Sequence, residues 1–195
     1  MSVPVMNLVS RDLPLGYPPD FYPLFNLIGL YDAIIFGGIL RDAYSGEKRY
    51  KDIDVIALPE SKKKLMRELA LLGWGEDEAI SSSSSEEGRR VFTNILNSSF
   101  TAIDFTSYSD VNTDSIEAWR AAWAHTSNVD IRCNAIAWTP TSGVMALPGA
   151  LEDCKGRNIH VLTRHDKTVN RIGELERRGW KNSSPDHFSR KGYPF

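Results

Sequence analysis

The sequence predicts a single α/β (α+β) domain, in which a small mixed sheet is flanked by helices and a short helix follows at the C-terminal end. Short apolar runs bounded by glycine, proline or charged residues predict strands, and segments with apolar residues at helical spacing alternate with them. The chain has 195 residues, of which 42% are hydrophobic and 25% charged, as suits one soluble domain with a core. Its formal net charge of -2 argues against a protein that coats nucleic acid with its whole surface.

The first part of the chain predicts two strands and three helices. Residues 1–20 contain four prolines and are expected to form an extended N-terminal arm. Helices are expected over 21–30 and 39–44, and strands over 33–36 and 53–58. Ser61 is expected to cap a third helix, whose predicted buried face consists of Leu65, Met66, Leu69 and Leu72.

The second part predicts a hairpin, two helices and a tail. A serine-rich loop around 81–88 precedes two strands, over 90–96 and 100–108, that are joined by a short turn. A helix is expected over 114–125, and a last helix over 167–178, which ends at a glycine.

The segment between the first two strands carries the pattern most informative about function. Gly37-Gly38 stands where a strand gives way to a helix, and backbone N–H groups at such a turn and at the helix N-terminus can approach phosphates. Arg41, one turn into that helix, reaches towards the same phosphates and is followed by Asp42. Taken singly, the glycines indicate only a turn and Arg41-Asp42 only a surface pair. Their joint occurrence in the order strand, glycines, helix, loop, strand favours a nucleotide-binding site.

Three aspartates are the candidate metal ligands and catalytic residues. Asp52 and Asp54 are two positions apart on one strand and therefore point to the same face. Mg²⁺ prefers carboxylates, substrate phosphates and water as ligands. Asp104, between Ile103 and Phe105, is either a surface residue of its strand or a third carboxylate that completes a two-metal site. Such a site predicts attack of a hydroxyl on the α-phosphate of a nucleoside triphosphate.

These motifs closely resemble the signature of the polymerase-β-like nucleotidyltransferases. Phe36-Gly-Gly-Ile-Leu-Arg-Asp42, followed by Lys51-Asp-Ile-Asp-Val55, is most similar to the head domain of class II tRNA CCA-adding enzymes and bacterial poly(A) polymerases. The segment 103–108 resembles the strand that carries that family's third acidic position, and 130–138 resembles its Asp-Phe-Thr-x-Asn-Ala segment. The resemblance implies that Asp130 and Asn134 lie near the sugar or triphosphate of a nucleotide, with a capping aspartate and a turn asparagine as the alternative.

The resemblance implies a nucleotidyltransferase fold over residues 21–165, between the N-terminal arm at 1–20 and a C-terminal helix and tail at 166–195. It also implies an Mg²⁺-dependent enzyme that uses a nucleoside triphosphate, and an RNA 3′ end as acceptor, as in tRNA processing. A protein or small-molecule hydroxyl as acceptor, and a non-catalytic regulatory module, are the alternatives.

The chain departs from the family pattern at several positions. Asn128 and Val129 replace paired arginines, and Arg132 replaces a threonine. The base-selecting motif has only a partial counterpart in His165-Asp166 and Arg171. These departures bring protein-directed choice of CTP and ATP into question.

Cysteine usage and hydropathy predict a cytoplasmic protein without a membrane partner. Cys133 and Cys154 lack the spacing of metal ligands and fit a reducing compartment. No apolar segment of the sequence is long enough to span a bilayer, and no signal peptide is evident.

Overall fold

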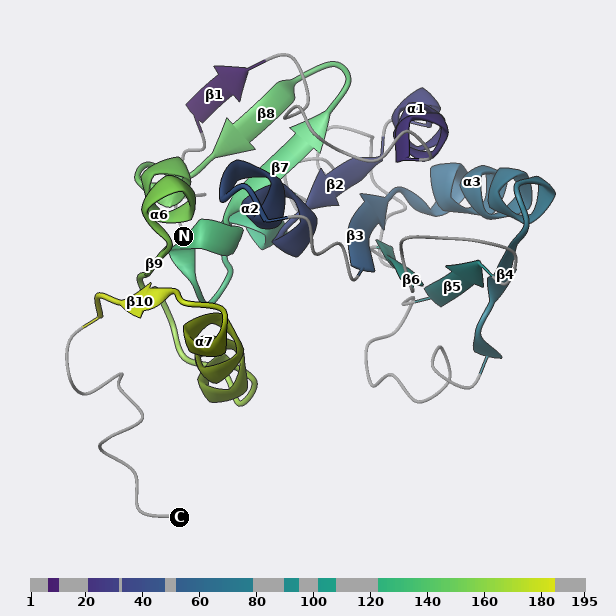
Figure 1. Ribbon diagram of the computed structural model, residues 1–195. Helices are drawn as coiled ribbons and strands as arrows, with labels where there is room; N and C mark the ends of the chain where they lie inside the picture. The colour runs from purple at the N-terminus through teal and green to yellow at the C-terminus, as the bar shows by residue number, and fades with distance from the viewer. Residues whose placement is uncertain are drawn as a thin grey trace.

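The computed structural model describes residues 7–10, 21–31, 33–47, 52–78, 90–94, 102–107 and 123–184. Within these ranges, eight strands form one sheet and two short strands form another. The strands of the large sheet are β1 (Asn7–Ser10), β2 (Ile34–Phe36), β3 (Asp52–Ala57), β4 (Trp74–Glu76), β5 (Arg90–Asn94), β6 (Ala102–Ser107), β7 (Ile136–Thr139) and β8 (Gly143–Ala146). Their order is β1-β8-β7-β2-β3-β6-β5-β4 (Figure 1). The small sheet pairs β9 (Asn158–Ile159) with β10 (Lys181–Asn182).

The large sheet is mixed, as the sequence predicts. Within this sheet β3 runs parallel to β6, whereas its other described pairs of neighbouring strands are antiparallel. The antiparallel pairing of β5 with β6 confirms the predicted hairpin, although the connection between these strands lies outside the described residues. Within the expected N-terminal arm, residues 7–10 form the strand at the edge next to β8.

The helices pack around the sheet. Those with described bounds are α1 (Phe21–Leu30), α2 (Gly38–Tyr44), α3 (Pro59–Leu71), α6 (Ala150–Gly156), α7 (Thr168–Arg177) and the short 3₁₀ helix η1 (Arg132–Asn134). α1 and α3 lie together near one end of the sheet, and α2 contacts α6 nearer the other end, with α7 beyond them (Figure 1). Residues 123–127 are also helical, whereas 114–122 of the helix predicted there lie outside the described residues, as do the loop at 81–88 and the tail at 185–195. No helix in the described part of the chain is long and apolar enough to cross a membrane.

Alternation along β3 separates a core face from the face that carries the aspartates. Ile53 and Val55 are fully buried in the main core cluster, together with side chains of α1, α2, α3 and α7. On the opposite face, Ile56 packs in a smaller cluster with Ile34 of β2, and Trp123 packs against this cluster. Since side chains two apart on a strand share a face, Asp52 and Asp54 lie on the side of Ile56.

The start and end of α3 differ from the prediction. Ser61 is not its N-cap: the helix begins at Pro59, and Leu58 occupies the cap position without a side-chain hydrogen bond. Proline fits the first turn of a helix because the N–H that it lacks has no partner within the helix there. Leu65 and Leu69 are fully buried as predicted, but Leu72 is 49% exposed because it follows the last helical residue.

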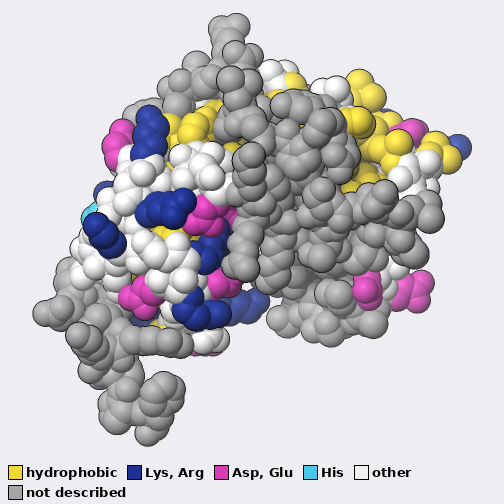
Figure 2. Space-filling model, viewed as in Figure 1, with side chains coloured by type: hydrophobic (Ala, Val, Ile, Leu, Met, Phe, Trp, Pro, Cys, Tyr) yellow, Lys and Arg dark blue, Asp and Glu magenta, His cyan; other side chains and the backbone are white. Residues whose placement is uncertain are grey.

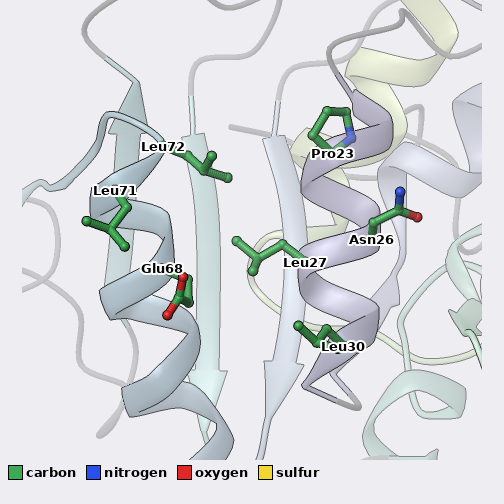
Figure 3. Close-up of a pocket in the computed structure, with 7 residues that line it drawn as sticks. All are labelled: Pro23, Asn26, Leu27, Leu30, Glu68, Leu71 and Leu72. Atoms are coloured by element: carbon green, nitrogen blue, oxygen red, sulfur yellow. The ribbon is translucent and has the colours of Figure 1, made fainter.

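An apolar groove separates α1 from α3 (Figure 3). Leu30 and Leu71, at the C-terminal ends of these helices, are 75% and 76% exposed. Apolar side chains gather over this end of the molecule, whereas charged side chains gather on the side of α6 and α7 (Figure 2). The groove has a volume of about 410 Å³ and is lined by Pro23, Asn26, Leu27, Leu30, Glu68, Leu71 and Leu72. None of these residues belongs to the candidate site.

Candidate functional site

The turn between β2 and α2 lies against the aspartate pair. Gly37 has a φ of 76° and a ψ of -132°, which residues with a Cβ rarely adopt, and α2 begins at Gly38. The N–H of Gly37 donates a hydrogen bond to the carbonyl oxygen of Ile136 (2.9 Å), so backbone donors for a phosphate would have to come from Gly38 onward. A methyl group on Gly37 would lie 3.3 Å from Oδ2 of Asp54. The turn and the carboxylate are therefore in direct proximity.

The register of the sheet brings the three predicted metal-ligand positions together. Asp54 is aligned with Phe36 on β2 and with Asp104 on β6, and Asp52 is aligned with Ala102. Aligned residues on neighbouring strands share a face of the sheet, as do residues two apart on one strand. Positions 52, 54 and 104 therefore lie on the same face, on two parallel strands. The side chain of Asp104 lies outside the described residues.

The chemistry of these positions fits a magnesium ion. Mg²⁺ is held in phosphate-transferring enzymes by one or two carboxylates together with phosphate oxygens and water. Asp52 and Asp54 are both partly exposed and thus accessible from solvent. Among the side chains that the structure describes, no three potential ligands come together as a metal site. Asp104, which is aligned with Asp54 on the neighbouring strand, is the predicted third protein ligand.

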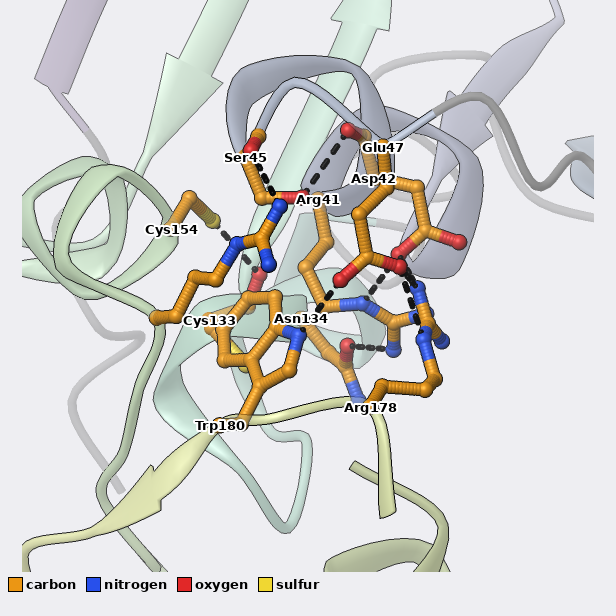
Figure 4. Close-up of polar contacts among 10 residues, drawn as sticks. Arg41, Asp42, Ser45, Glu47, Cys133, Asn134, Cys154, Arg178 and Trp180 are labelled. Atoms are coloured by element: carbon orange, nitrogen blue, oxygen red, sulfur yellow. Dashed lines mark hydrogen bonds and ion pairs between the residues drawn. The ribbon is translucent and has the colours of Figure 1, made fainter. Parts of the chain in front are cut away.

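Arg41 lies beside the glycine turn. Its Nε donates to Oδ1 of Asp42 (2.7 Å), and its Nη1 donates to Oδ1 of Asn134 (2.8 Å) (Figure 4). A methyl group on Gly38 would lie 3.5 Å from its Nη2, which is the third nitrogen of the guanidinium. Burial alone would lower the pKa of Arg41, but Asp42 raises it above its ordinary value. The turn therefore has a permanent positive charge next to it.

Two carboxylates connect α2 to the C-terminal part of the chain. Arg178, which directly follows α7, donates from Nη2 to Oδ1 of Asp42 (2.6 Å) and from Nε to Oε2 of Glu47 (2.8 Å). The indole N–H of Trp180 donates to Oε1 of Glu47 (2.9 Å). Asp42, which the sequence predicts to be part of the nucleotide site, thus links Arg41 to Arg178 (Figure 4).

The two residues of the second predicted nucleotide motif have different surroundings. Asp130 is 1% exposed, and its carboxylate accepts hydrogen bonds from the hydroxyl of Thr168 and from Nη1 of Arg171 (2.9 Å each). Asn134, the last residue of η1, accepts the hydrogen bond from Arg41. The structure therefore places Asn134 beside Arg41 and turns the carboxylate of Asp130 towards α7.

Arg132, which stands where the resembling family has threonine, forms an ion pair instead. Its Nε and Nη2 donate to the two carboxylate oxygens of Asp153 on α6 (2.6 and 2.9 Å). Cys133 and Cys154 are buried free thiols nearby, and burial raises the pKa of Cys133 to about 12. Both thiols therefore stay protonated at neutral pH and act as core residues.

Comparison with solved structures identifies the fold. The chain superimposes on the Thermotoga maritima CCA-adding enzyme complexed with tRNA at a TM-score of 0.62 and 19% identity, over 96% of this chain and 44% of that one. It has the fold of a CCA-adding enzyme. A CCA-adding enzyme in complex with CTP matches at 0.59 and 19% identity, over 85% and 39% of the two chains. One in complex with ATP matches at 0.56 and 20% identity, over 91% and 40%.

The similarity to CCA-adding enzymes is one of fold, and it is partial. The chain spans less than half the length of these three structures. No protein-family model matches the sequence, and no curated protein does. The nucleotidyltransferase fold predicted from the sequence is confirmed, whereas the roles of individual site residues stay predictions.

The contacts at the C-terminal side of the CCA-adding-enzyme fold were not predicted from the sequence. Glu47, Arg178 and Trp180 form no motif, and Glu47 is separated from the other two by more than half of the chain. The surplus of arginines at the end of α7 is a weak signal, since cations are commonly found in the last turn of a helix.

Acidification should weaken the contact of Arg178 and Trp180, in the C-terminal segment, with Glu47. Burial acts to raise the pKa of Glu47, but the hydrogen bonds from Arg178 and Trp180 outweigh it and hold the pKa below its ordinary value. Glu47 therefore contributes stability that is present above its unfolded pKa of about 4.3 and is lost as pH falls through the lower folded pKa. In urea titrations between pH 7 and pH 3.5, Glu47→Gln should lose less stability on acidification than the wild type. Equal losses in the two proteins would contradict this assignment.

Proposed function

We propose that this protein is an Mg²⁺-dependent nucleotidyltransferase that moves a nucleoside monophosphate from a nucleoside triphosphate to a hydroxyl group. The alignment of Asp104 with Asp54, directly beside Gly37, is the observation that carries the proposal. It joins a carboxylate face to a glycine turn, and these are the two parts that metal-assisted phosphoryl chemistry requires. The fold of ATP- and CTP-bound CCA-adding enzymes supports the same class of substrate.

In the proposed reaction the three aspartates would hold the metal, and one of them would also accept the proton of the acceptor hydroxyl. Asp52, Asp54 and Asp104 would hold Mg²⁺, which supplies charge neutralisation of the triphosphate and of the leaving pyrophosphate when it is bound. The acceptor hydroxyl forms a bond to the α-phosphorus, and the bond from that phosphorus to the oxygen bridging to the β-phosphate breaks. Asp104 takes the hydroxyl proton, and the bond electrons leave with pyrophosphate.

The glycine turn and its neighbours would bind the triphosphate. Gly37 allows the backbone to pass close to Asp54, and Gly38 keeps the approach to the guanidinium of Arg41 open. Arg41 would pair with a phosphate oxygen through the nitrogen that lies at the turn. Asn134 would orient Arg41 and contact the nucleotide, and Asp130 would fix the segment before η1 through its bonds to α7.

An RNA 3′ end is the proposed acceptor. The Thermotoga maritima structure that shares this fold is a complex with tRNA, and the motif around Gly37 and Asp54 resembles the RNA-directed branch of the family. A protein or small-molecule hydroxyl would be the acceptor if RNA were not labelled.

Labelling with all four nucleoside triphosphates tests the function. The purified protein is incubated with each α-³²P-labelled triphosphate and total cellular RNA or protein, with Mg²⁺ or with excess EDTA. We expect label in RNA, release of pyrophosphate, and loss of both in EDTA. Calorimetry of each triphosphate with Mg²⁺ provides a binding measurement that needs no acceptor. Absence of both labelling and binding for all four triphosphates would refute the proposal.

A further inference from the structure

We propose that Arg178 is a positioning residue for the nucleotide site: it holds Asp42 so that Asp42 fixes the guanidinium of Arg41 against the glycine turn. This inference rests on the proposed function and assigns part of the site's geometry to the segment that follows α7. The contacts form a continuous chain from Arg178 to Asp42, from Asp42 to Arg41, and from Arg41 to the turn.

A single oxygen atom joins the two arginines. Oδ1 of Asp42 accepts from Nη2 of Arg178 at 2.6 Å and from Nε of Arg41 at 2.7 Å. The three side chains are between 6% and 12% exposed, so water competes little for these hydrogen bonds. A charge-assisted hydrogen bond in such surroundings is strong and directional. The rotamer of Asp42 is therefore determined from both sides.

Arg41, held in this way, has its third guanidinium nitrogen, Nη2, next to the glycine turn. Nε of Arg41 is used by Asp42 and Nη1 by Asn134, while Nη2 would lie 3.5 Å from a methyl group on Gly38. The described residues provide no hydrogen-bond acceptor for Nη2 of Arg41. The ring of Trp180 lies beneath the same guanidinium, with Cζ at 5.9 Å from the ring centroid. Both partners that come from the C-terminal segment thus act on the orientation of Arg41.

Charge balance explains why the loss of Arg178 should move Arg41. Arg41 and Arg178 together neutralise Asp42 and Glu47, and all four side chains are largely buried. Without Arg178, two carboxylates would share Arg41, and a buried carboxylate that has lost its ion-pair partner is strongly unfavourable even where it keeps a neutral hydrogen-bond donor, as Glu47 keeps Trp180. We therefore expect Arg41 to turn from Asn134 and the glycine turn towards the carboxylates.

The test compares Arg178→Gln with Arg177→Gln in two measurements. Both variants lose one positive charge at the end of α7, but Arg177 is exposed and, among the residues described, donates only to the carbonyl of Gly173. The first measurement is the ¹⁵N NMR signal of the Arg41 Nε–H and its protection from exchange, without nucleotide. The second is calorimetric affinity for ATP and for CTP with Mg²⁺. Arg178→Gln should shift the signal, remove its protection and weaken affinity about tenfold or more, the usual scale when partners that orient a binding group are removed.

Two further variants separate the positioning of Arg41 from the attachment of the C-terminal segment to Glu47. Trp180→Phe keeps an aromatic ring beneath Arg41 and leaves Arg178 on Asp42 but removes the hydrogen bond to Glu47, so it should lower thermal stability while the Arg41 Nε–H stays protected from exchange and the affinity is retained. Arg178→Lys keeps the charge and can reach one carboxylate at a time, so its affinity should lie between those of wild type and Arg178→Gln. It also serves as the test variant if Arg178→Gln does not fold.

The results distinguish failure of this inference from failure of the proposed function. An unchanged Arg41 signal and unchanged affinity in Arg178→Gln, in a protein that binds nucleotide, would overturn the positioning role alone. Equal losses in Arg178→Gln and Arg177→Gln would overturn it as well, because they would indicate a general charge effect. A wild-type protein that binds no triphosphate would overturn the proposed function and with it the role of Arg178 at a nucleotide site.

Discussion

Asp54→Asn should abolish most nucleotidyl transfer while the protein stays folded. The substitution keeps the size of the side chain and removes the negative charge that would hold Mg²⁺ beside the glycine turn. We expect the rate of nucleotide incorporation to fall on the order of a hundredfold or more, as is typical when a group that stabilises developing charge is lost. Single-turnover labelling at saturating triphosphate measures this loss directly.

Thermal unfolding provides a measurement of the same site that does not depend on activity. A ligand that binds only the folded state raises the melting temperature, so Mg²⁺ should stabilise the wild type and have little effect on Asp54→Asn. Glu176→Gln, an exposed carboxylate change on α7, is the matched control. Retained turnover in Asp54→Asn would exclude a role for this carboxylate.

Gly37→Ala should both destabilise the fold and impair the site. The backbone at Gly37 has a φ of 76° and a ψ of -132°, and a non-glycine residue there costs about 1–3 kcal/mol. The added methyl group would also lie 3.3 Å from Oδ2 of Asp54, a distance at which the carboxylate has to move. Urea unfolding and nucleotide incorporation, both at a temperature where the variant is folded, measure the two effects.

Gly46→Ala separates backbone strain from disturbance of the site. Gly46 also has a positive φ, of 73°, but nothing lies within 4 Å of an added methyl group. We expect a stability loss of about 1–2 kcal/mol in Gly46→Ala, with activity retained in the folded protein. If the two variants lost activity equally, the close approach of Gly37 to Asp54 would have no functional importance.

The glycine turn and the aspartate pair could be predicted because their signals are local. Gly37 and Asp54 lie within one short strand–helix–strand segment, where spacing along the chain determines which face each residue occupies. Asp104 was harder to assign, since its position beside Asp54 depends on which strands become neighbours. Alternation with Ile103 and Phe105 indicated a face, and the parallel register then aligned it with Asp54.

The remaining contacts of the site depend on tertiary packing and left no local signal. Arg178 meets Asp42 only because the segment at the end of α7 packs against the first part of the chain, and the sequence pattern of α7 predicts a helix but not its partner. The surroundings of Asp130 likewise follow from that packing, through Thr168 and Arg171.

At the ends of elements, single residues allowed two interpretations. Pro59 is compatible both with the end of a strand and with the first turn of a helix, and here it begins α3. Boundaries of this kind are decided by the competition between neighbouring elements rather than by one residue.

The parallel pairing of β3 with β6 has a consequence for how the protein folds. β2 and β3 are close in sequence, as are β4, β5 and β6, so each group can form early from local contacts. The contact between β3 and β6 instead closes a long loop, whose entropic cost delays it. Chains that have formed only these two local groups would therefore lack the assembled carboxylate face, and catalytic competence would appear late, together with the pairing of β6 with β3.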